Sequence, residues 1–210
     1  MALYAPVALR PSWAQTSQAT APSSARFRIL VVGDSLSAEY GLRRGSGWVA
    51  LLTQRLAKEG LSADVRNASI SGDTTSGGRA RLAPLLRSYQ PTHMILELGG
   101  NDALRGLPLK STADNLRAMT QAAQDAGAQV LIVGMQVPPN YGSDYGRQFA
   151  SLFAEVAAER KAGFVPFLLK GVADRPDAAA LFQADRIHPR EEAQATMLDN
   201  VWPALRRQLR

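Results

Sequence analysis

Four short polar sequences contain the residues of this chain that could take part in a reaction. Three of them follow apolar runs, at residues 33–37, 67–73 and 99–102, and the fourth, at 185–189, precedes the last predicted helix. Each combines small residues with serine, aspartate or asparagine, a combination that a connecting loop does not require. Because reactive groups of open parallel sheets gather at the carboxyl ends of the strands, these sequences indicate a functional site.

A serine hydroxyl is a weak nucleophile and needs a neighbouring general base. The chain has no cysteine and only two histidines, so a thiol nucleophile is excluded and the choice of base is narrow. His93 falls at the start of a predicted strand, the wrong end of the sheet, and is interpreted as structural. His188 lies three residues after Asp185, a spacing that lets the carboxylate hold one ring nitrogen while the other faces Ser35. Taken alone, Ser35 could instead be a helix N-cap.

A serine hydrolase also needs hydrogen-bond donors directed at the oxyanion of its tetrahedral intermediate. The backbone N–H groups of Ser35 and Gly72 and the side-chain amide of Asn101 could supply three such donors. We expect the neighbouring Asp34 and Asp102 to brace loops by accepting backbone hydrogen bonds, and not to transfer protons.

Alternating apolar segments predict the elements that must position these residues. Strands are predicted at 27–32, 63–68, 92–98, 129–133 and 164–168. Helices are predicted at 48–58, 76–88, 112–126, 144–161 and 191–208, with Pro84 a weakness in the second. This alternation is typical of a parallel sheet with right-handed crossovers and helices on both faces. The predicted strands and helices occupy residues 27–210, which leaves no room for a second domain.

The composition excludes several function classes. The 210 residues are 46% hydrophobic and 20% charged, which is ordinary for a globular domain. The absence of cysteine excludes a disulfide scaffold, Cys-ligated zinc and iron–sulfur clusters, and two histidines argue against a His-rich metal site. We therefore expect no metal and no cofactor. There is no apolar run long enough to span a bilayer.

The chain is basic, with a net charge of +6 and a pI near 10.1, which suggests nucleic acid or anionic membranes as partners. The arginines are scattered, however, and the densest group, Arg206, Arg207 and Arg210, follows an apolar run where cations suit the end of a helix. No nucleic-acid motif is present. We expect no nucleic-acid partner and, at most, peripheral contact with anionic lipid.

Residues 1–26 differ from the rest and are dominated by Ala, Pro, Ser, Thr and Gln. Two interpretations remain open. The stretch could be the remnant of a secretory signal, because residues 2–9 are mildly apolar and residues 12–14 resemble a cleavage site, although Arg10 interrupts the apolar part. It could equally be a disordered tail.

In order, the four polar sequences contain the blocks GDSLS at 33–37, ISGDT around Gly72, GGND at 99–102 and DRIHP at 185–189. With these blocks the chain resembles the SGNH/GDSL hydrolase superfamily, and in particular its bacterial arylesterase, thioesterase I and lysophospholipase group. The resemblance extends from Phe27 to the C-terminus. One block alone occurs by chance in many chains, whereas four in order at strand ends are a strong signal.

The resemblance implies a flavodoxin-like three-layer α/β/α sandwich around a five-stranded parallel sheet. It implies Ser35 as nucleophile, His188 as base and Asp185 as the residue that orients it, with an oxyanion hole formed by Ser35, Gly72 and Asn101. The expected activity is that of a cofactor-free serine esterase that hydrolyses acyl esters and thioesters through an acyl-enzyme. Relatives in this group are commonly exported, so we expect a periplasmic or secreted protein.

Residues 103–109 resemble the mobile loop that lies beside the acyl site in the family. Its leucines, Leu104, Leu107 and Leu109, could contact the acyl group or could equally belong to the core. Two other function classes remain open. The blocks faintly resemble the Asp, Asn and His ligand loops of metal-dependent phosphoesterases, and the fold could serve a non-catalytic module that binds acyl chains or anions.

Overall fold

The computed structural model describes Met1 and residues 25–210, so the predictions for residues 1–26 lie almost entirely outside the described residues. Its central feature is a sheet of five parallel strands in the order β2-β1-β3-β4-β5. The strands are β1 (Phe27–Gly33), β2 (Ala63–Asn67), β3 (His93–Glu97), β4 (Gln129–Val133) and β5 (Gly163–Val165).

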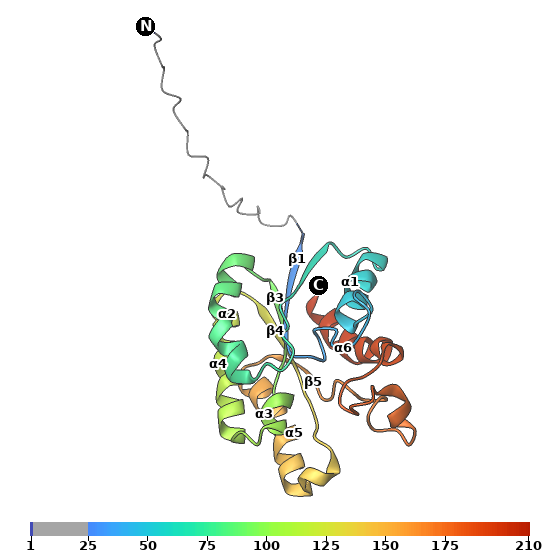
Figure 1. Ribbon diagram of the computed structural model, residues 1–210. Helices are drawn as coiled ribbons and strands as arrows, with labels where there is room; N and C mark the ends of the chain where they lie inside the picture. Colours follow the sequence, from blue (N-terminus) through green and yellow to red (C-terminus); the bar gives the residue numbers. More distant parts are fainter. Residues whose placement is uncertain (2–24) are drawn as a thin grey trace.

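This strand order places a topological switch beside β1, because the chain passes from β1 to β2 on one side and then across to β3 on the other. The register pairs Val31 with Asn67 and Gly33 with Glu97, so the carboxyl ends of these three strands lie level. They point toward the lower part of Figure 1. The polar sequences that follow the three strands therefore meet at one edge of the sheet, where ligands of such folds bind.

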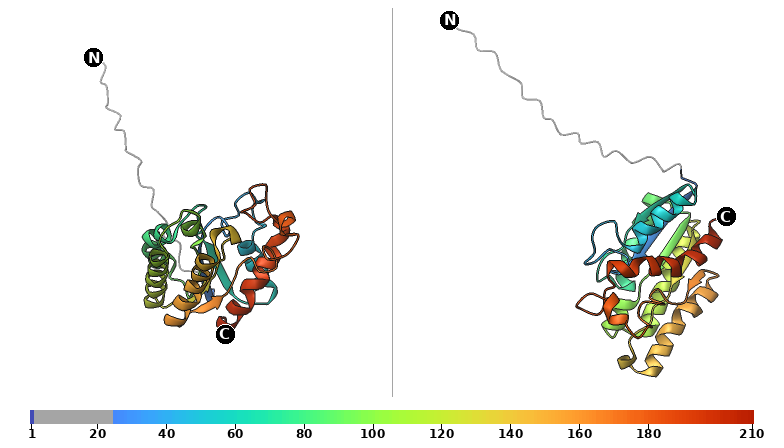
Figure 2. Two further views of the ribbon diagram at one scale, coloured as in Figure 1. Left: turned by 90° about the horizontal axis from the view of Figure 1, so that it is seen from below. Right: turned by 90° about the vertical axis from the view of Figure 1, so that its right-hand side faces the viewer.

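Helices cover both faces of the sheet. One layer contains α1 (Trp48–Lys58) and α6 (Gln194–Gln208), and the other contains α2 (Thr75–Tyr89), α4 (Leu109–Asp125) and α5 (Ser143–Glu159). The two layers are seen on either side of the sheet in Figure 1 and in the left view of Figure 2. The predicted three-layer sandwich with a five-stranded parallel sheet is confirmed.

The central strands are apolar in their middle residues because both of their faces are covered there. Residues 29–32 of β1 and residues 94–96 of β3 have no exposed surface. Trp48, Phe149 and Phe153 from the helices complete the packing on the two faces. A core that is continuous on both sides of the sheet gives the strand ends a rigid base, and the site is built on those ends.

Two predicted elements end or divide differently in the structure. The predicted strand over 164–168 is wrong beyond Val165, because Pro166 has no N–H with which to continue the ladder and the chain turns there. The predicted helix over 191–208 is divided into a 3-10 turn, η3 (Glu191–Ala193), followed by α6. The other predicted strands and helices are present with boundaries shifted by three residues at most.

Three short elements were not expected, because a few residues carry too little periodicity to predict them. They are α3 (Gly100–Leu104), η1 (Pro139–Tyr141) and η2 (Ala178–Leu181). Helix α2 continues through Pro84, since the buried Leu82 and Leu86 on either side anchor it to the core.

His93 is buried at the amino end of β3, far along the strand from the reactive edge. Its Nδ1 lies 2.9 Å from Thr92 Oγ1, and its Nε2 lies 3.3 Å from the carbonyl oxygen of Gln208. Burial lowers the pKa of this imidazole, so it is neutral and joins β3 to the end of α6. This supports the structural interpretation of His93.

Candidate active site

Ser35 lies in a turn over residues 35–41 that directly follows β1. The first helix after it begins only at Trp48, with Gly47 as its N-cap, so the interpretation of Ser35 as an N-cap is wrong. The turn is shaped by Asp34, whose Oδ1 accepts a hydrogen bond from Leu36 N at 3.0 Å. Ser35 is half-buried and its hydroxyl faces away from the strand toward a second loop.

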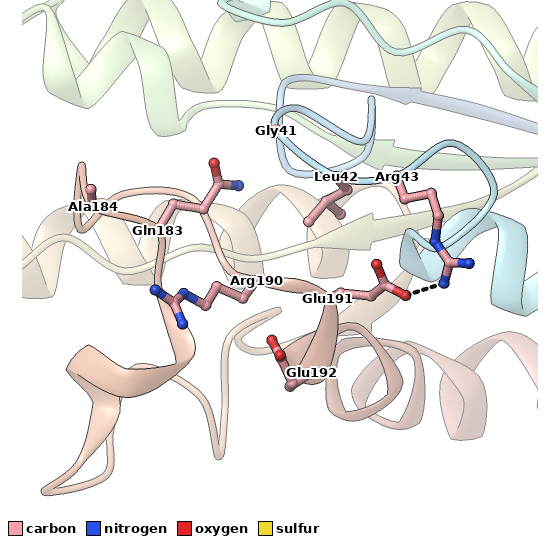
Figure 3. Close-up of a pocket in the computed structure, with 8 residues that line it drawn as sticks. All are labelled: Gly41, Leu42, Arg43, Gln183, Ala184, Arg190, Glu191 and Glu192. Atoms are coloured by element: carbon pink, nitrogen blue, oxygen red, sulfur yellow. Dashed lines mark hydrogen bonds and ion pairs between the residues drawn. The ribbon is translucent and has the colours of Figure 1, made fainter.

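That second loop is a hairpin over residues 182–189, which forms an antiparallel bridge between its two ends. The N–H of Gln183 donates to the carbonyl oxygen of His188 at 2.8 Å, and Arg186 at its tip has a positive φ of 57°. In Figure 3 this segment lies opposite the loop that contains Gly41, so two parts of the chain about 140 residues apart form one site.

Asp185 and His188 are joined within the hairpin. Asp185 Oδ2 lies 2.7 Å from His188 Nδ1, while Oδ1 accepts hydrogen bonds from the N–H groups of Ile187 at 2.9 Å and His188 at 3.0 Å. These hydrogen bonds lower the pKa of Asp185 to about 2, and the bond from His188 N has the largest effect. The carboxylate is therefore ionised at any physiological pH and holds the proton of a neutral imidazole on Nδ1.

The remaining ring nitrogen, His188 Nε2, lies 2.8 Å from Ser35 Oγ. With the proton placed on Nδ1 by Asp185, Nε2 is the acceptor and the serine hydroxyl is the donor. The ring of Tyr40 covers one side of the imidazole, with 4.3 Å between the ring centroids. The structure thus brings together the three residues that the sequence predicted as a Ser-His-Asp group.

Two of the three predicted oxyanion donors are backbone groups without an acceptor. Among the described residues, neither the N–H of Ser35 nor that of Gly72 donates to a protein atom. Gly72 has a φ of 79°, a conformation that glycine adopts without strain. The site therefore contains two backbone donors that a ligand could use.

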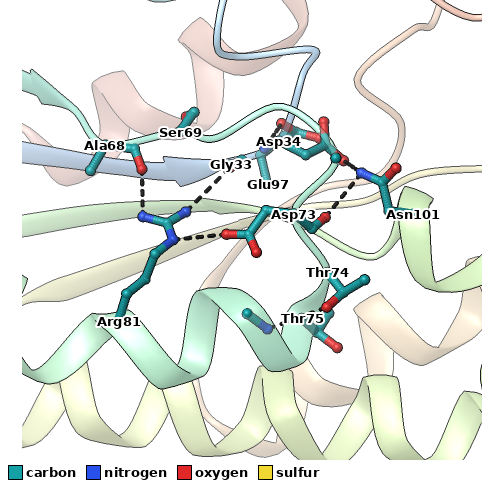
Figure 4. Close-up of polar contacts among 12 residues, drawn as sticks. Gly33, Asp34, Ala68, Ser69, Asp73, Thr74, Thr75, Arg81, Glu97 and Asn101 are labelled. Carbon is teal, nitrogen blue, oxygen red and sulfur yellow. Dashed lines mark hydrogen bonds and ion pairs between the residues drawn. The ribbon is translucent and has the colours of Figure 1, made fainter.

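The third predicted donor, Asn101, has both amide hydrogens engaged. Its Nδ2 donates to Asp34 Oδ2 at 3.0 Å and to the carbonyl oxygen of Asp73 at 2.9 Å (Figure 4). Asn101 thereby joins the loop that contains Ser35 to the loop that contains Gly72. It lies where the prediction requires, but one of its hydrogens must be shared or released before it can serve an oxyanion.

A buried acidic residue, Glu97, supports the turn that contains Ser35. This role was not predicted from the sequence. Glu97 Oε2 accepts hydrogen bonds from Ser37 Oγ at 2.6 Å and from Asp34 N at 3.4 Å. Burial raises the pKa of Glu97 well above its ordinary value, and it raises that of Asp34 to about 6. A Cβ at Gly33 would lie 2.8 Å from Glu97 Oε2, which explains the glycine at this position. The signal in the sequence was a charged residue inside an otherwise apolar strand.

Arg81 is a second brace that was not predicted. From α2 its guanidinium donates to Asp73 Oδ2 at 2.8 Å, to the carbonyl oxygen of Ala68 at 2.5 Å and to that of Gly33 at 3.5 Å (Figure 4). It therefore fixes the ends of β1 and β2 relative to the loop that contains Gly72. An arginine within an amphipathic helix carries no signal of this role.

The loop-bracing role expected for the two aspartates is present. Asp34 accepts from Leu36 N, and Asp102 Oδ2 accepts from Thr75 N at 2.9 Å. The hydroxyl of Thr75 also donates to Asp102 Oδ1. Asp102 is buried and joins the start of α2 to α3.

The three leucines proposed for the acyl site have different surroundings. Leu109 packs against the core, which favours the core interpretation for this residue. Leu107 is half-buried, and Leu104 at the end of α3 is 47% exposed. Next to Leu104, Arg105 donates to the carbonyl oxygen of Gly72 at 2.7 Å, so this segment lies against the loop of the backbone donor.

A polar pocket of about 370 Å³ lies between the loop that contains Gly41 and the residues at the two ends of the hairpin (Figure 3). It is lined by residues 41–43, 183–184 and 190–192, and an ion pair between Arg43 and Glu191 spans it at 2.5 Å. None of Ser35, Asp185 and His188 lines it. The pocket is therefore separate from the reactive atoms.

The part of the chain that the structure describes contains no group of three or more His, Asp or Glu side chains placed to hold a metal ion. Among the same residues, no helix has the length and apolar character needed to cross a membrane.

A histidine that lies between an aspartate and a serine, at the switch point of a parallel sheet, is the arrangement typical of hydrolases that use an activated serine. Comparisons with known proteins agree. The model of the GDSL-like Lipase/Acylhydrolase family matches residues 31–196. The chain therefore belongs to this family, and it is a serine esterase.

Individual relatives cover most of the chain. Esterase TesA of Pseudomonas aeruginosa is 50% identical over 178 residues, which are 85% of this chain and 87% of that protein. Thioesterase 1/protease 1/lysophospholipase L1 of Escherichia coli is 37% identical over 84% of this chain and 82% of that protein. The crystal structure of the psychrotrophic esterase EstA from Pseudoalteromonas sp., inhibited by monoethylphosphonate, is similar with a TM-score of 0.81 and 38% identity, over 87% of this chain and 98% of that chain.

Proposed function

We propose that Ser35 is the nucleophile and His188 the general base of this esterase. Ser35 Oγ attacks the acyl carbon while His188 Nε2 takes the hydroxyl proton, and Asp185 stabilises the imidazolium that forms. His188 then gives the proton to the departing alcohol or thiol, which leaves an acyl-enzyme on Ser35. A water molecule, deprotonated by His188, hydrolyses that ester and restores the serine. The observation that carries this proposal is the unbroken series of hydrogen bonds from Asp185 through His188 to Ser35.

The oxyanion of each tetrahedral intermediate would receive hydrogen bonds from the backbone N–H groups of Ser35 and Gly72. Asn101 would supply a third by turning one amide hydrogen away from Asp34 or by sharing it. A charged oxyanion is a stronger acceptor than a carbonyl group, so this exchange is favourable only once the intermediate forms. The third donor would thus act on the transition state and not on the bound substrate.

We propose acyl esters and acyl thioesters as the substrates. The names of the relatives, an esterase and a thioesterase/lysophospholipase, support this range. Leu104 is the candidate for contact with the acyl chain, because it is half exposed and lies next to the arginine that holds the Gly72 loop.

A panel of p-nitrophenyl esters and acyl thioesters of increasing chain length tests this function with the wild type and Ser35→Ala. We expect Ser35→Ala to abolish turnover of every substrate, while Ser151→Ala, a matched change of a serine on α5 that bonds only to the carbonyl oxygen of Gln148, leaves turnover unchanged. Equal hydrolysis by wild type and Ser35→Ala would overturn the assignment.

The same assay separates the alternatives. A metal-dependent phosphoesterase would lose activity with EDTA and would resist a serine-directed phosphonate, whereas the serine esterase gives the opposite pattern. A non-catalytic module would bind acyl compounds without turning them over, and Ser35→Ala would not change that binding.

We also propose peripheral contact with anionic lipid around the mouth of the site. Apart from Met1, the large apolar side chains most exposed among the described residues are 47–51% exposed, and each lies within, or within about three residues of, one of the four polar sequences: Tyr40, Ile70, Leu104 and Ile187. Arginines adjoin two of them, at positions 105 and 186. Exposed apolar side chains beside cations suit an anionic lipid surface.

Co-sedimentation with phosphatidylglycerol and phosphatidylcholine vesicles at increasing salt tests this contact. We expect binding to the anionic vesicles alone, and a loss of roughly 30-fold in Arg105→Gln/Arg186→Gln at about 1 kcal/mol per cation. The control, Lys58→Gln/Arg87→Gln, removes two cations at helix ends on the opposite edge of the sheet. Equal binding by the two double variants, or none by the wild type, would contradict the proposal.

For localisation we propose the periplasm or secretion, on the basis of the composition of residues 1–26. Cell fractionation followed by N-terminal sequencing of the mature protein tests it. A cytoplasmic protein that retains Met1 or Ala2 would overturn it.

A further inference from the structure

The turn that contains Ser35 and the hairpin that contains His188 come from opposite ends of the chain, and a side chain outside the triad joins them. Gln183 Nε2 donates to the carbonyl oxygen of Tyr40 at 2.9 Å, across the gap between hairpin and turn. In Figure 3 the Gln183 side chain points from the hairpin toward the loop of Gly41. The other direct bond between these two loops is the catalytic one, from Ser35 to His188.

Gln183 is also bonded into the hairpin on both sides of His188. Its N–H donates to the carbonyl oxygen of His188 at 2.8 Å, and its own carbonyl oxygen accepts from Arg186 N at 2.9 Å. The amide Nε2 lies 3.4 Å from the carbonyl oxygen of Pro189 as well. One residue thus holds the backbone that carries His188 and the backbone of the facing turn.

The facing turn is shaped to receive this amide. Gly41 has a φ of 69°, and a Cβ at this position would overlap Gln183 Oε1. The preceding residue, Tyr40, receives the hydrogen bond on its carbonyl oxygen and places its ring on the His188 imidazole. The bond to the backbone and the contact with the catalytic ring therefore depend on the same short segment.

We propose that Gln183 is a positioning residue that sets the distance between Ser35 and His188. It acts through two backbones and not on the substrate, so this role rests on the proposed roles of Ser35 and His188. Without its bond to Tyr40, the exposed hairpin can move away from the turn while the fold stays intact. Because a misplacement of about 1 Å can cost on the order of 100-fold in rate, the loss falls on the chemical step.

Gln183→Met tests the proposal, because methionine keeps the length of the side chain and removes the donor. The matched control is Gln124→Met, since Gln124 Nε2 makes the same kind of bond, to the carbonyl oxygen of Arg160 at 2.7 Å, between α4 and the end of α5. We measure kcat and KM for a p-nitrophenyl ester, the second-order rate of inactivation by a fluorophosphonate, and the thermal midpoint.

For Gln183→Met we expect kcat and the inactivation rate to fall together by roughly 10- to 100-fold, with KM within about twofold of the wild type. Gln124→Met should lower the thermal midpoint by a similar amount and leave kcat unchanged. If Gln183→Met changes only the thermal midpoint, as the control does, its role is merely structural and the proposal is wrong.

Gly41→Ala provides a second, independent way to break the same contact, because the added methyl displaces the Gln183 amide. Since both changes remove one bond, the double variant should be no slower than the slower single variant. Additive losses would overturn the proposal. If Gln183→Met fails to fold, Gly41→Ala is measured alone, and an inactivation rate equal to that of the wild type would overturn the proposal. Hydrolysis by Ser35→Ala would instead refute the proposed function, so the two failures are distinguishable.

Discussion

The two loops that meet at the site are held in different ways. The turn that contains Ser35 rests on buried polar groups, because Asp34, Ser37 and Glu97 beneath it are each at most 3% exposed. The hairpin that contains His188 is exposed, and residues 184–187 at its tip all lie on the surface. Its shape comes from its own backbone bonds and from the carboxylate of Asp185.

Because of this difference, we expect substitutions in the two loops to affect different properties, stability for the turn and catalysis for the hairpin. Changes beneath the turn alter buried, poorly solvated groups, so they act mainly on the free energy of unfolding. Substitutions in the hairpin remove little buried surface. They move His188 or change which of its ring nitrogens carries the proton, so we expect them to act mainly on kcat. The turn that contains Ser35 is anchored in the core, whereas His188 is placed against it by an exposed hairpin.

The largest effect tests the hairpin side. Asp185→Asn keeps an oxygen for the two backbone N–H groups but turns an amide donor toward His188 Nδ1. The imidazole must then carry its proton on Nε2 and cannot accept the one from Ser35, so kcat should fall on the order of 10⁴-fold. Steady-state kinetics with an ester substrate measure this, with KM nearly unchanged. The control is Asp199→Asn, an exposed partner of Arg55, and a loss below 10-fold would contradict the account.

The next effect lies between the two sides. Asn101→Ala removes the proposed third oxyanion donor, so kcat should fall roughly 10²- to 10³-fold. Asn115→Ala, an asparagine on α4 that bonds to Thr75 Oγ1, should leave kcat unchanged. If Asn101→Ala reduces stability and leaves kcat within twofold, Asn101 only joins the two loops.

Beneath the turn the expected loss is one of stability. Arg81→Met leaves the mostly buried Asp73 carboxylate without its partner and the carbonyl oxygen of Ala68 without a donor, while that of Gly33 keeps the N–H of Ile70 at 3.1 Å. Chemical denaturation should show the free energy of unfolding reduced by ~2–4 kcal/mol. At a temperature where the variant is folded, kcat should remain within about tenfold of the wild type. A fully stable Arg81→Met variant with no activity would show that Arg81 acts on catalysis and not on stability, contrary to this expectation.

The last effect is a change in pH dependence. The pKa of Glu97 is raised in the folded state, so the folded protein binds more protons than the unfolded one above pH 4.5. Stability is therefore lost as the pH rises above that value, by at most ~1.4 kcal/mol per pH unit for one proton. Glu97→Gln should remove this loss between pH 5 and pH 8 in urea denaturation. An unchanged slope would show that Glu97 does not titrate in this way.

The contrast between the loops also explains what the sequence could predict. The triad was accessible because the chain offers two histidines and because Asp185 and His188 are local partners, three residues apart. The fold followed from the alternation of strands and helices. Local spacing and periodicity can be recognised in a sequence without knowledge of the tertiary fold.

The supports of the site were not accessible in this way. Arg81, Glu97 and Gln183 bond to Gly33, Ser37 and Tyr40, which are 48, 60 and 143 residues away along the chain. The engaged amide of Asn101 likewise depends on Asp34 and Asp73 meeting in space. Such contacts are products of the tertiary fold, and apart from the charge of Glu97 in an apolar strand, the residue types give no sign of them.

The central claim, that Ser35 is the nucleophile, is tested most directly by labelling with a fluorophosphonate, whose phosphorus forms a bond to the attacking oxygen as fluoride leaves. We expect the intact mass of the wild type to rise by one phosphonyl group, peptide mapping to place that group on Ser35, and hydrolysis to stop in proportion to labelling. Ser35→Ala should take up no label. A label on another residue, or full activity in the labelled protein, would contradict the account.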